Sequence, residues 1–234
     1  MVSIDKALSI ADVRELARKR LPSSIFGYVD GASEDKSSLH GNRSAFSKWS
    51  FLTHPLVNVS IRNLSVQIFD EHYSLPIGIS PMGVSALCGY EGDLSLARAA
   101  KQMNAPFVLS AASTIPVERV IEENPRTWYQ AYIPADFAVI EPLLNRLKRS
   151  NVQVLVVTVD VQVASTRENE LRNGFTIPLR PNLKLLMGGL MRPRWLLGTF
   201  FKTLALKGIP RFENFTADRG GPIIKVAKGN HRAG

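Results

Sequence analysis

Cysteine is almost absent from this sequence: among its 234 residues, Cys88 is the single one, so a disulfide framework is excluded. Long apolar runs are missing as well. A membrane-spanning helix needs ~20 consecutive apolar residues, and the most apolar part of the chain is interrupted by Arg192, Pro193 and Arg194. Residues 1–21 lack the apolar core of a signal peptide. We therefore expect the chain to reside in the cytoplasm.

Phosphate-binding loops and clusters of metal ligands are also missing. Neither GxGxxG nor GxxxxGK[ST] occurs, which excludes the two commonest nucleotide-binding loops. The histidines stand singly, and none of them ends a predicted strand, so the sequence predicts no metal site. They are His40, His54, His72 and His231.

Acidic residues are missing from one segment, residues 180–211. It holds seven basic residues and no acidic one, whereas the rest of the chain holds 22 basic and 20 acidic residues. Apolar residues share the segment, and Leu196, Leu197, Phe200, Phe201 and Leu204 recur at helical spacing. This pattern favours a helix that lies in the interface of an anionic membrane. The alternatives are a long loop with a core-packed helix and, least favoured, nucleic-acid binding, because exposed aromatic and polar groups are not interleaved with the basic residues.

What the sequence does contain is a regular alternation of strand and helix patterns. A first helix is predicted over 10–19, followed by a polar, turn-rich stretch and two short strands near 49–52 and 65–69. The alternating part then has strands at 76–80, 106–110, 127–133 and 152–160, and helices at 92–103, 115–124 and 137–150. Such βα units predict an α/β fold with a parallel sheet. The continuous apolar run of the fourth strand predicts that both of its faces are covered.

Each predicted strand ends on a polar side chain. The strand ends carry Ser80, Ser110, Gln130 with Tyr132, and Thr158 with Asp160. A lone Ser or Asp there is usually a turn residue or a helix cap. Two polar residues spaced two apart share one face of a strand, and ligands of parallel βα folds collect at the carboxyl ends of the strands. The pattern therefore predicts a binding site at this end of the sheet.

These residues also carry a resemblance. The stretches FGYVDGASED, PIGISPMG, GDLSLARAAKQMNAPFVLSAAST, WYQAYI and LVVTVDVQVASTRENELRNGF together resemble the FMN-dependent L-2-hydroxy-acid dehydrogenase and oxidase family. That family includes L-lactate and mandelate dehydrogenases and glycolate oxidase. The resemblance implies a (β/α)8 TIM barrel, of which this chain covers an N-terminal cap and the first four βα units. It also implies FMN as cofactor.

The resemblance assigns roles to the strand ends. Side chains that contact the flavin ring are expected at Ser110, Gln130 and Thr158, and a turn whose backbone approaches the ring is expected at Pro81, Met82 and Gly83. Members of the family usually have threonine at the position of Met82. Hydrogen bonds of this kind hold a flavin and tune its electron affinity.

Substrate and catalytic roles follow in the same way. Tyr28 and Tyr132 match substrate-side tyrosines, and the planar fork of Arg167 suits a substrate carboxylate or the charge that develops on the flavin. Asp160 matches the aspartate that orients the catalytic histidine as it becomes protonated. The residues before Arg167, Ser165 and Thr166, differ from those common in the family, so the local loop geometry is open. The expected catalytic set is Asp160, Tyr132 and Tyr28.

The resemblance covers the N-terminal part of the family only. The lysine of the fifth strand, the histidine–arginine loop and the phosphate-binding glycines have no counterpart, and we do not interpret 222–234 as a compressed version of them. The expected organisation is a cap with connecting strands at 1–75, half of an FMN-binding barrel at 76–179, a basic apolar membrane-interface segment at 180–215 and a tail at 216–234. The segment corresponds in place to the membrane-binding segment of membrane-attached bacterial members.

The implied reaction is the FMN-dependent oxidation of a lactate-like or mandelate-like L-2-hydroxy acid to the 2-keto acid, by a truncated or fragmentary member of the family. The sequence leaves the electron acceptor unknown, with a quinone or a cytochrome chain as options, and does not separate a dehydrogenase from an oxidase. A homo-oligomer is expected at full length, and the expected location is the inner face of the cell membrane. The alternative function is a non-catalytic half-barrel, or a membrane-associating module that needs a partner for the missing half.

Overall fold

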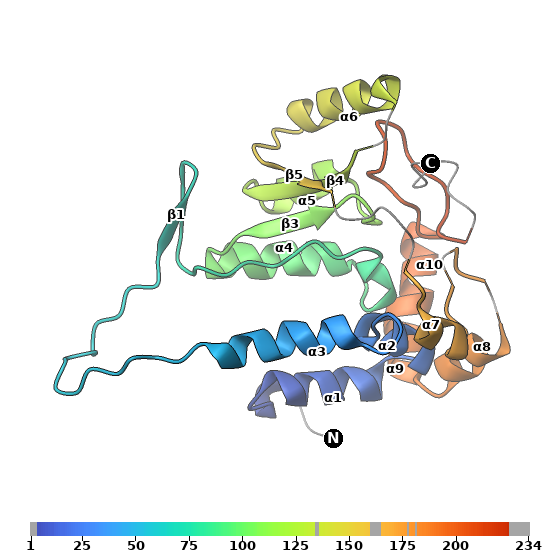
Figure 1. Cartoon of the computed structure of the whole chain (residues 1–234). Coiled ribbons are helices and arrows are strands. Elements are labelled where there is room, and N and C mark those ends of the chain that lie inside the picture. The colour runs from blue at the N-terminus through green and yellow to red at the C-terminus, as the bar shows by residue number, and fades with distance from the viewer. Residues whose placement is uncertain (1–3, 134–135, 160–164, 177, 181, 225–234) are drawn as a thin grey trace.

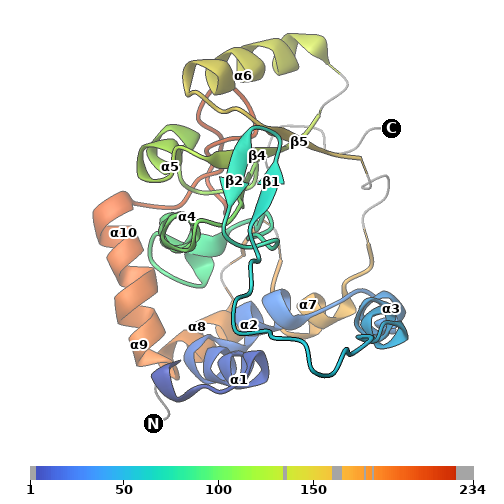
Figure 2. The ribbon, with the colours of Figure 1, turned by 90° about the vertical axis from the view of Figure 1, so that its left-hand side faces the viewer.

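A small parallel sheet with helices on one side stands above a layer of N-terminal helices (Figures 1 and 2). The computed structural model describes residues 4–133, 136–159, 165–176, 178–180 and 182–224. In the lower layer, α1 to α3 lie beside α7, α8 and α9, and α10 rises next to α4 and α5 (Figure 2). The helices α7 to α10 thus connect the N-terminal helical layer with the layer that contains the parallel sheet.

The N-terminal layer is more helical than the sequence predicted. It comprises η1 (Ile4–Lys6), α1 (Ile10–Arg20), α2 (Ser23–Asp30), α3 (Ser37–Ser44) and η2 (Ala45–Lys48). The first helix is confirmed, and a capping box at Ser9 and Asp12 fixes its start. The turn-rich stretch was expected to be irregular, and this was wrong over α2 and α3. Tertiary packing stabilises α2, because its Ile25 is buried against Phe175 and Trp195.

Residues 49–64 form an arm that extends away from the body (Figure 1). The strand predicted near 49–52 is wrong, because no strand is present there. Apolar side chains of the arm are exposed, and Phe51 is 98% exposed. The arm leads into an antiparallel hairpin of β1 (Val66–Ile68), which confirms the second predicted strand, and β2 (Glu71–Tyr73).

The βα units agree closely with the predicted ranges. The order is η3 (Ser85–Leu87), α4 (Gly92–Met103), β3 (Phe107–Ser110), α5 (Val117–Glu123), β4 (Thr127–Tyr132), α6 (Phe137–Arg149) and β5 (Leu155–Thr158). β3, β4 and β5 form a parallel sheet in that order. The first predicted strand, 76–80, is reduced to a parallel bridge between Ile79 and Phe107. The described sheet has the expected strand order and does not close into a barrel.

The core lies between this sheet and its helices. Tyr129 and Ala131 of β4 are buried against α4, α5 and α6. Their parallel partners on β5, Leu155 and Val157, lie on the same face but are 39% and 45% exposed. The expectation that both faces of this strand are covered is therefore wrong. β5 is an edge strand of the described sheet, and the next described helix, α7, lies in the lower layer and not over the sheet.

The basic apolar segment is largely helical. After α7 (Glu168–Arg172) come α8 (Leu183–Leu190), α9 (Pro193–Trp195), the π-helical turn η4 (Leu196–Phe201) and α10 (Lys202–Lys207). The last three run on without a break, which confirms the predicted helical spacing. Trp195 anchors them by donating from its indole Nε1 to the carbonyl of Leu87 at 2.7 Å. Within the described ranges, every helix is too short or too polar to cross a membrane.

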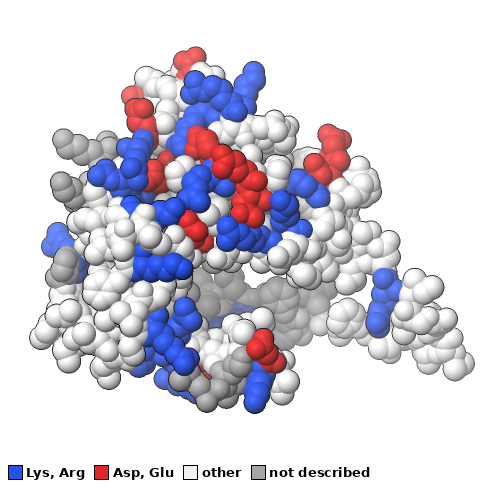
Figure 3. Space-filling view, turned by 180° about the vertical axis from the view of Figure 1, so that it is seen from behind, with Lys and Arg blue, Asp and Glu red and all other residues white. Residues whose placement is uncertain are grey.

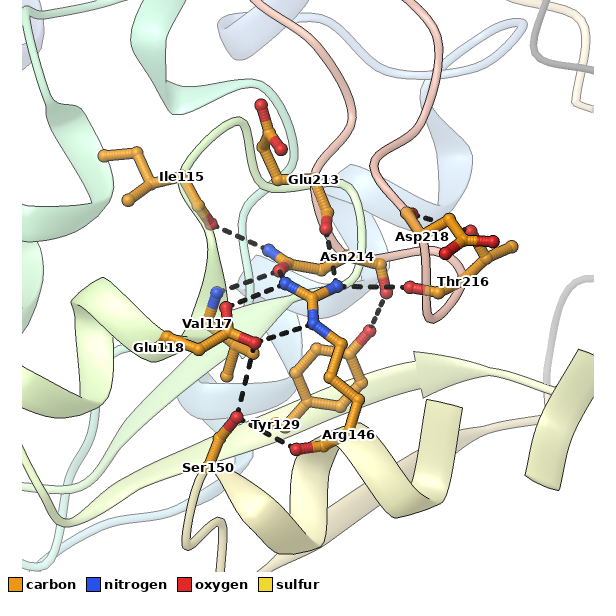
Figure 4. A network of polar contacts seen from close by, with 10 residues as sticks. All are labelled: Ile115, Val117, Glu118, Tyr129, Arg146, Ser150, Glu213, Asn214, Thr216 and Asp218. Carbon is orange, nitrogen blue, oxygen red and sulfur yellow. Dashed lines mark hydrogen bonds and ion pairs between the residues drawn. The ribbon is translucent and has the colours of Figure 1, made fainter. Parts of the chain in front are cut away.

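Asn214 fastens the chain that returns from this segment to the βα units (Figure 4). Its side chain is fully buried, accepts from the backbone N–H of Val117 at 2.9 Å and donates to the carbonyl of Ile115 at 2.8 Å. The hydroxyl of Tyr129 donates to the carbonyl of Asn214. Burial raises the pKa of Tyr129, so this hydroxyl stays protonated and remains a donor.

Arg146 of α6 completes the network (Figure 4). Its guanidinium forms a bidentate pair with Glu118, with both nitrogen–oxygen distances at 2.8 Å, and donates to the carbonyl of Glu213 at 2.8 Å. Two helices and the returning chain thus meet at one planar group, whose several donors suit such a junction.

We expect Asn214→Ala to lower the free energy of unfolding by about 2–6 kcal/mol, because two buried backbone groups lose their partners at about 1–3 kcal/mol each. Asn42 is exposed on α3 and serves as a control, and Asn42→Ala should change stability by less than about 0.5 kcal/mol. Urea denaturation measures both changes. Equal effects in the two variants would contradict the role given to Asn214.

A second prediction concerns acid stability. The hydrogen bonds from Arg146 lower the pKa of Glu118 in the folded chain. The stabilisation is therefore complete above the unfolded value, about 4.3, and is lost as the pH falls through the lower folded value. We expect Glu118→Gln to flatten the fall in unfolding free energy below about pH 5. Denaturant titrations across acidic pH test this, and an unchanged slope would rule the pair out as a contributor.

Candidate functional site

A row of uncharged polar side chains crosses the carboxyl ends of the three parallel strands. The hydroxyl of Ser110 on β3 donates to Oε1 of Gln130 on β4 at 3.1 Å, and Nε2 of Gln130 donates to the hydroxyl of Thr158 on β5 at 2.8 Å. Gln130 is 2% exposed. The strand register causes this, since Ser110 pairs directly with Gln130 and Thr158 pairs with Tyr132, two residues further along the same face of β4. The structure therefore brings the three predicted ring-contacting side chains together.

The predicted turn at Pro81, Met82 and Gly83 lies next to this row. The chain before it is bonded to β3 through the bridge at Ile79, and the chain after it is fixed by the N–H of Val84, which donates to the carbonyl of Ala112 at 3.1 Å. A Cβ atom on Gly83 would lie 3.0 Å from that of Ala112, so glycine allows the close approach. Pro81 and Met82 are exposed. The turn therefore presents an open face near Ser110.

Tyr28, Tyr132 and Arg167 gather from three distant parts of the chain. Burial raises the pKa of Tyr28, and the positive charge of Arg167 opposes that rise. Tyr132 acts electrostatically on both Tyr28 and Arg167, so the three lie within interaction range of one another. The ring of Tyr28 stacks on Phe175 with centroids 4.4 Å apart. The predicted substrate-side residues therefore lie near one another. Tyr132 connects them to the polar row, because it lies on β4 two residues after Gln130.

Arg167 already has an acidic neighbour. Its guanidinium donates to Oε1 of Glu170 at 2.9 Å and to the hydroxyl of Ser165 at 3.2 Å, and the bond to Glu170 raises the pKa of Arg167. A substrate carboxylate that binds Arg167 must therefore compete with Glu170. Asp160, the predicted partner of the catalytic histidine, lies outside the described residues.

Sequence reasoning missed several residues that support the site. Asp93 is buried at the start of α4 and accepts from the hydroxyl of Ser113 at 2.6 Å, which fixes the loop after β3. Burial raises the pKa of Asp93. The spacing of Arg167 and Glu170, three residues apart at a helix start, was a signal for their pairing. Phe175 and Ser113 carried no such signal, because their partners are distant in sequence.

Comparison with known proteins identifies the family of this chain. The profile of the FMN-dependent dehydrogenase family matches residues 17–226. The chain belongs to the FMN-dependent dehydrogenase family. Its relatives include (S)-mandelate dehydrogenase of Pseudomonas putida, 32% identical over 90% of this chain and 52% of the relative, and L-lactate oxidase of Lysinibacillus sphaericus, 31% identical over 74% of this chain and 45% of the relative. The chain thus spans about half the length of the curated relatives that it matches.

A solved structure also supports the fold. The crystal structure of the monotopic membrane protein (S)-mandelate dehydrogenase superposes with a TM-score of 0.81 at 33% identity, over 93% of this chain and 57% of that one. This confirms the fold family expected from the sequence. The described part shows the parallel sheet and helices of that family.

The donor set fits the cofactor of the FMN-dependent dehydrogenases. A flavin ring presents alternating carbonyl and N–H groups along one edge, so neutral groups that both donate and accept suit it. The amide of Gln130 keeps a second N–H, and the hydroxyls of Ser110 and Thr158 keep lone pairs beyond the bonds of the row. The exposed 81–83 turn lies against Ala112, two residues after Ser110.

Proposed function

We propose that this chain supplies the flavin-contacting and substrate-contacting part of an enzyme that oxidises an L-2-hydroxy acid to the 2-keto acid. The observation that carries the proposal is the hydrogen-bonded row of Ser110, Gln130 and Thr158, joined through Tyr132 to Tyr28 and Arg167. Family membership supports the reaction class, because relatives are named for mandelate and lactate.

In the proposed site, bound FMN would be the acceptor of the two electrons that leave the substrate. Ser110, Gln130 and Thr158 would hold the polar groups of the flavin ring, and the backbone of Pro81, Met82 and Gly83 would contact it. The row is held by its own hydrogen bonds before any ligand arrives, so little ordering is needed on binding. Its neutral groups position the ring without adding a fixed charge.

The substrate side has distinct proposed roles. Arg167 binds the carboxylate of the hydroxy acid, and the hydroxyls of Tyr28 and Tyr132 orient the remaining oxygens. The raised pKa of Tyr28 keeps its hydroxyl protonated at neutral pH, so it acts as a hydrogen-bond donor. Asp160 is proposed to orient and support the histidine that takes the substrate proton.

We also propose that α8, η4 and α10 rest on the surface of an anionic membrane. Leu183, Leu186, Leu190, Leu197 and Leu206 are exposed, and basic side chains lie among them in the sequence. Seen from behind, the side of the molecule that carries these helices is mostly white with separate blue side chains (Figure 3). Buried apolar area and attraction to anionic lipid together bind such surfaces. The similar mandelate dehydrogenase is described as a monotopic membrane protein.

The cofactor role is tested by titrating the purified chain with FMN and following flavin fluorescence. We expect saturable binding that Gln130→Leu weakens by at least about tenfold, because the central amide of the row is lost. Gln153→Leu, which changes an exposed glutamine before β5, should leave the affinity unchanged. Absence of binding, or equal affinities of the two variants, would refute the site. Dye reduction with L-mandelate or L-lactate then tests turnover, and bound flavin without turnover would favour the non-catalytic module.

The carboxylate role is tested by calorimetric binding of L-mandelate and L-lactate to the FMN-loaded chain. We expect Arg167→Met to weaken binding at least about tenfold, and Glu170→Gln to strengthen it, because the competing carboxylate is removed. Arg172→Met is the matched control, since Arg172 is an exposed arginine in the last turn of α7, which Arg167 precedes, and it pairs with Glu168. If Arg167→Met and Arg172→Met behave alike, the assignment fails.

A further inference from the structure

A cavity of about 320 Å³ lies among α1, α2, α7 and the junction of α8 with α9. Three of the side chains that line it are cationic, Arg18, Lys36 and Arg192, and one is acidic, Asp30. Its volume is at the lower end of the range typical of small-ligand sites, about 300–1,000 Å³. None of the residues proposed above for flavin or substrate lines it.

The charge of this cavity is positive. Asp30 is already engaged by Arg14, whose Nε and Nη2 donate to its two carboxylate oxygens at 2.5 and 2.6 Å. Arg18 pairs with Glu15 at 2.7 Å on the exposed surface, and such pairs are weak. Arg192 donates to the backbone carbonyls of Leu21 and Met191, which carry no net charge. The cavity can therefore attract a compact anion, and arginine suits the oxygens of a phosphate.

The cavity lies directly beside the apolar surface of α8. Arg192 lines the cavity, while the preceding residues, Leu190 and Met191, are 56% and 68% exposed. α8 also approaches α2 closely, because a Cβ atom on Gly188 would lie 3.4 Å from that of Pro22. A cationic cavity next to an exposed apolar helix matches a molecule with an anionic head and an apolar tail.

We propose that this cavity binds the phosphate of an anionic phospholipid while the acyl chains of that lipid lie against α8. The proposal rests on the membrane association proposed above and adds a defined headgroup site to it. The apolar surface alone would bind neutral and anionic vesicles alike. A cavity lined by cations favours anionic over neutral headgroups. This preference adds to the general attraction between basic residues and a charged surface.

The test compares two doubly substituted full-length chains that lose the same charge from the same part of the molecule. Arg18→Gln with Lys36→Gln removes two cations of the cavity, whereas Lys19→Gln with Arg20→Gln removes two exposed cations that do not line it. Co-sedimentation is measured with vesicles of phosphatidylcholine alone and of phosphatidylcholine mixed with phosphatidylglycerol. We expect the cavity variant to lose about tenfold more affinity for the mixed vesicles than the control, and both variants to bind the neutral vesicles equally.

Each other outcome also decides something. Equal losses in the two variants would overturn the cavity site and leave only general electrostatic attraction. If no vesicle binds, the membrane association fails, and titration with short-chain, water-soluble phosphatidylglycerol then decides the cavity by whether saturable binding disappears in the cavity variant. If inorganic phosphate binds the cavity as tightly as that lipid, the occupant is free phosphate and the lipid assignment is wrong. Melting temperatures of both variants verify that they are folded.

Discussion

The parallel register of β3, β4 and β5 is the constraint on which the candidate site depends. It sets Ser110 against Gln130 and places Thr158 within reach of the same amide. The buried amide of Gln130 therefore has a hydrogen-bond partner for its oxygen on β3 and for one of its N–H groups on β5. A slip of one residue would turn every side chain of a strand to the opposite face, breaking this row and exposing Tyr129 and Ala131. Core packing and the polar row therefore require the same register.

The second organising feature is the junction at Asn214 and Arg146. The chain leaves the sheet after β5, forms α7, α8 and α9 in the lower layer, rises through α10 beside α4 and α5, and returns at residues 212–216. Asn214 takes the place of a backbone partner for Val117 and Ile115, while Arg146 joins α5, α6 and the returning chain. This junction fastens the far end of the segment that carries α8 and α10. The proposed membrane surface is thus attached firmly to the sheet.

Exposed apolar surface is concentrated in three places: the arm at 49–64, the outer face of β5 and the helices α8 to α10. The chain covers about half of its relatives, and β5 is the edge of the described sheet. Local pattern could not reveal the exposure of Leu155 and Val157, because a continuous apolar run looks the same whether or not a neighbouring element covers it. Likewise, the Gly-rich and Ser-rich composition of 23–44 concealed α2, whose helix is stabilised by contacts with Phe175 and Trp195.

The sequence by itself determined the alternation of strands and helices, the strand ends at Ser110, Gln130 and Thr158, and the family, because periodicity and ordered motifs are local properties of the chain. Tertiary structure alone decided which of these groups meet. The stacking of Tyr28 on Phe175, the burial of Asn214 and the cationic cavity at Arg192 join residues through the geometry of packed elements. Contacts between distant residues follow from packing, which no local pattern specifies.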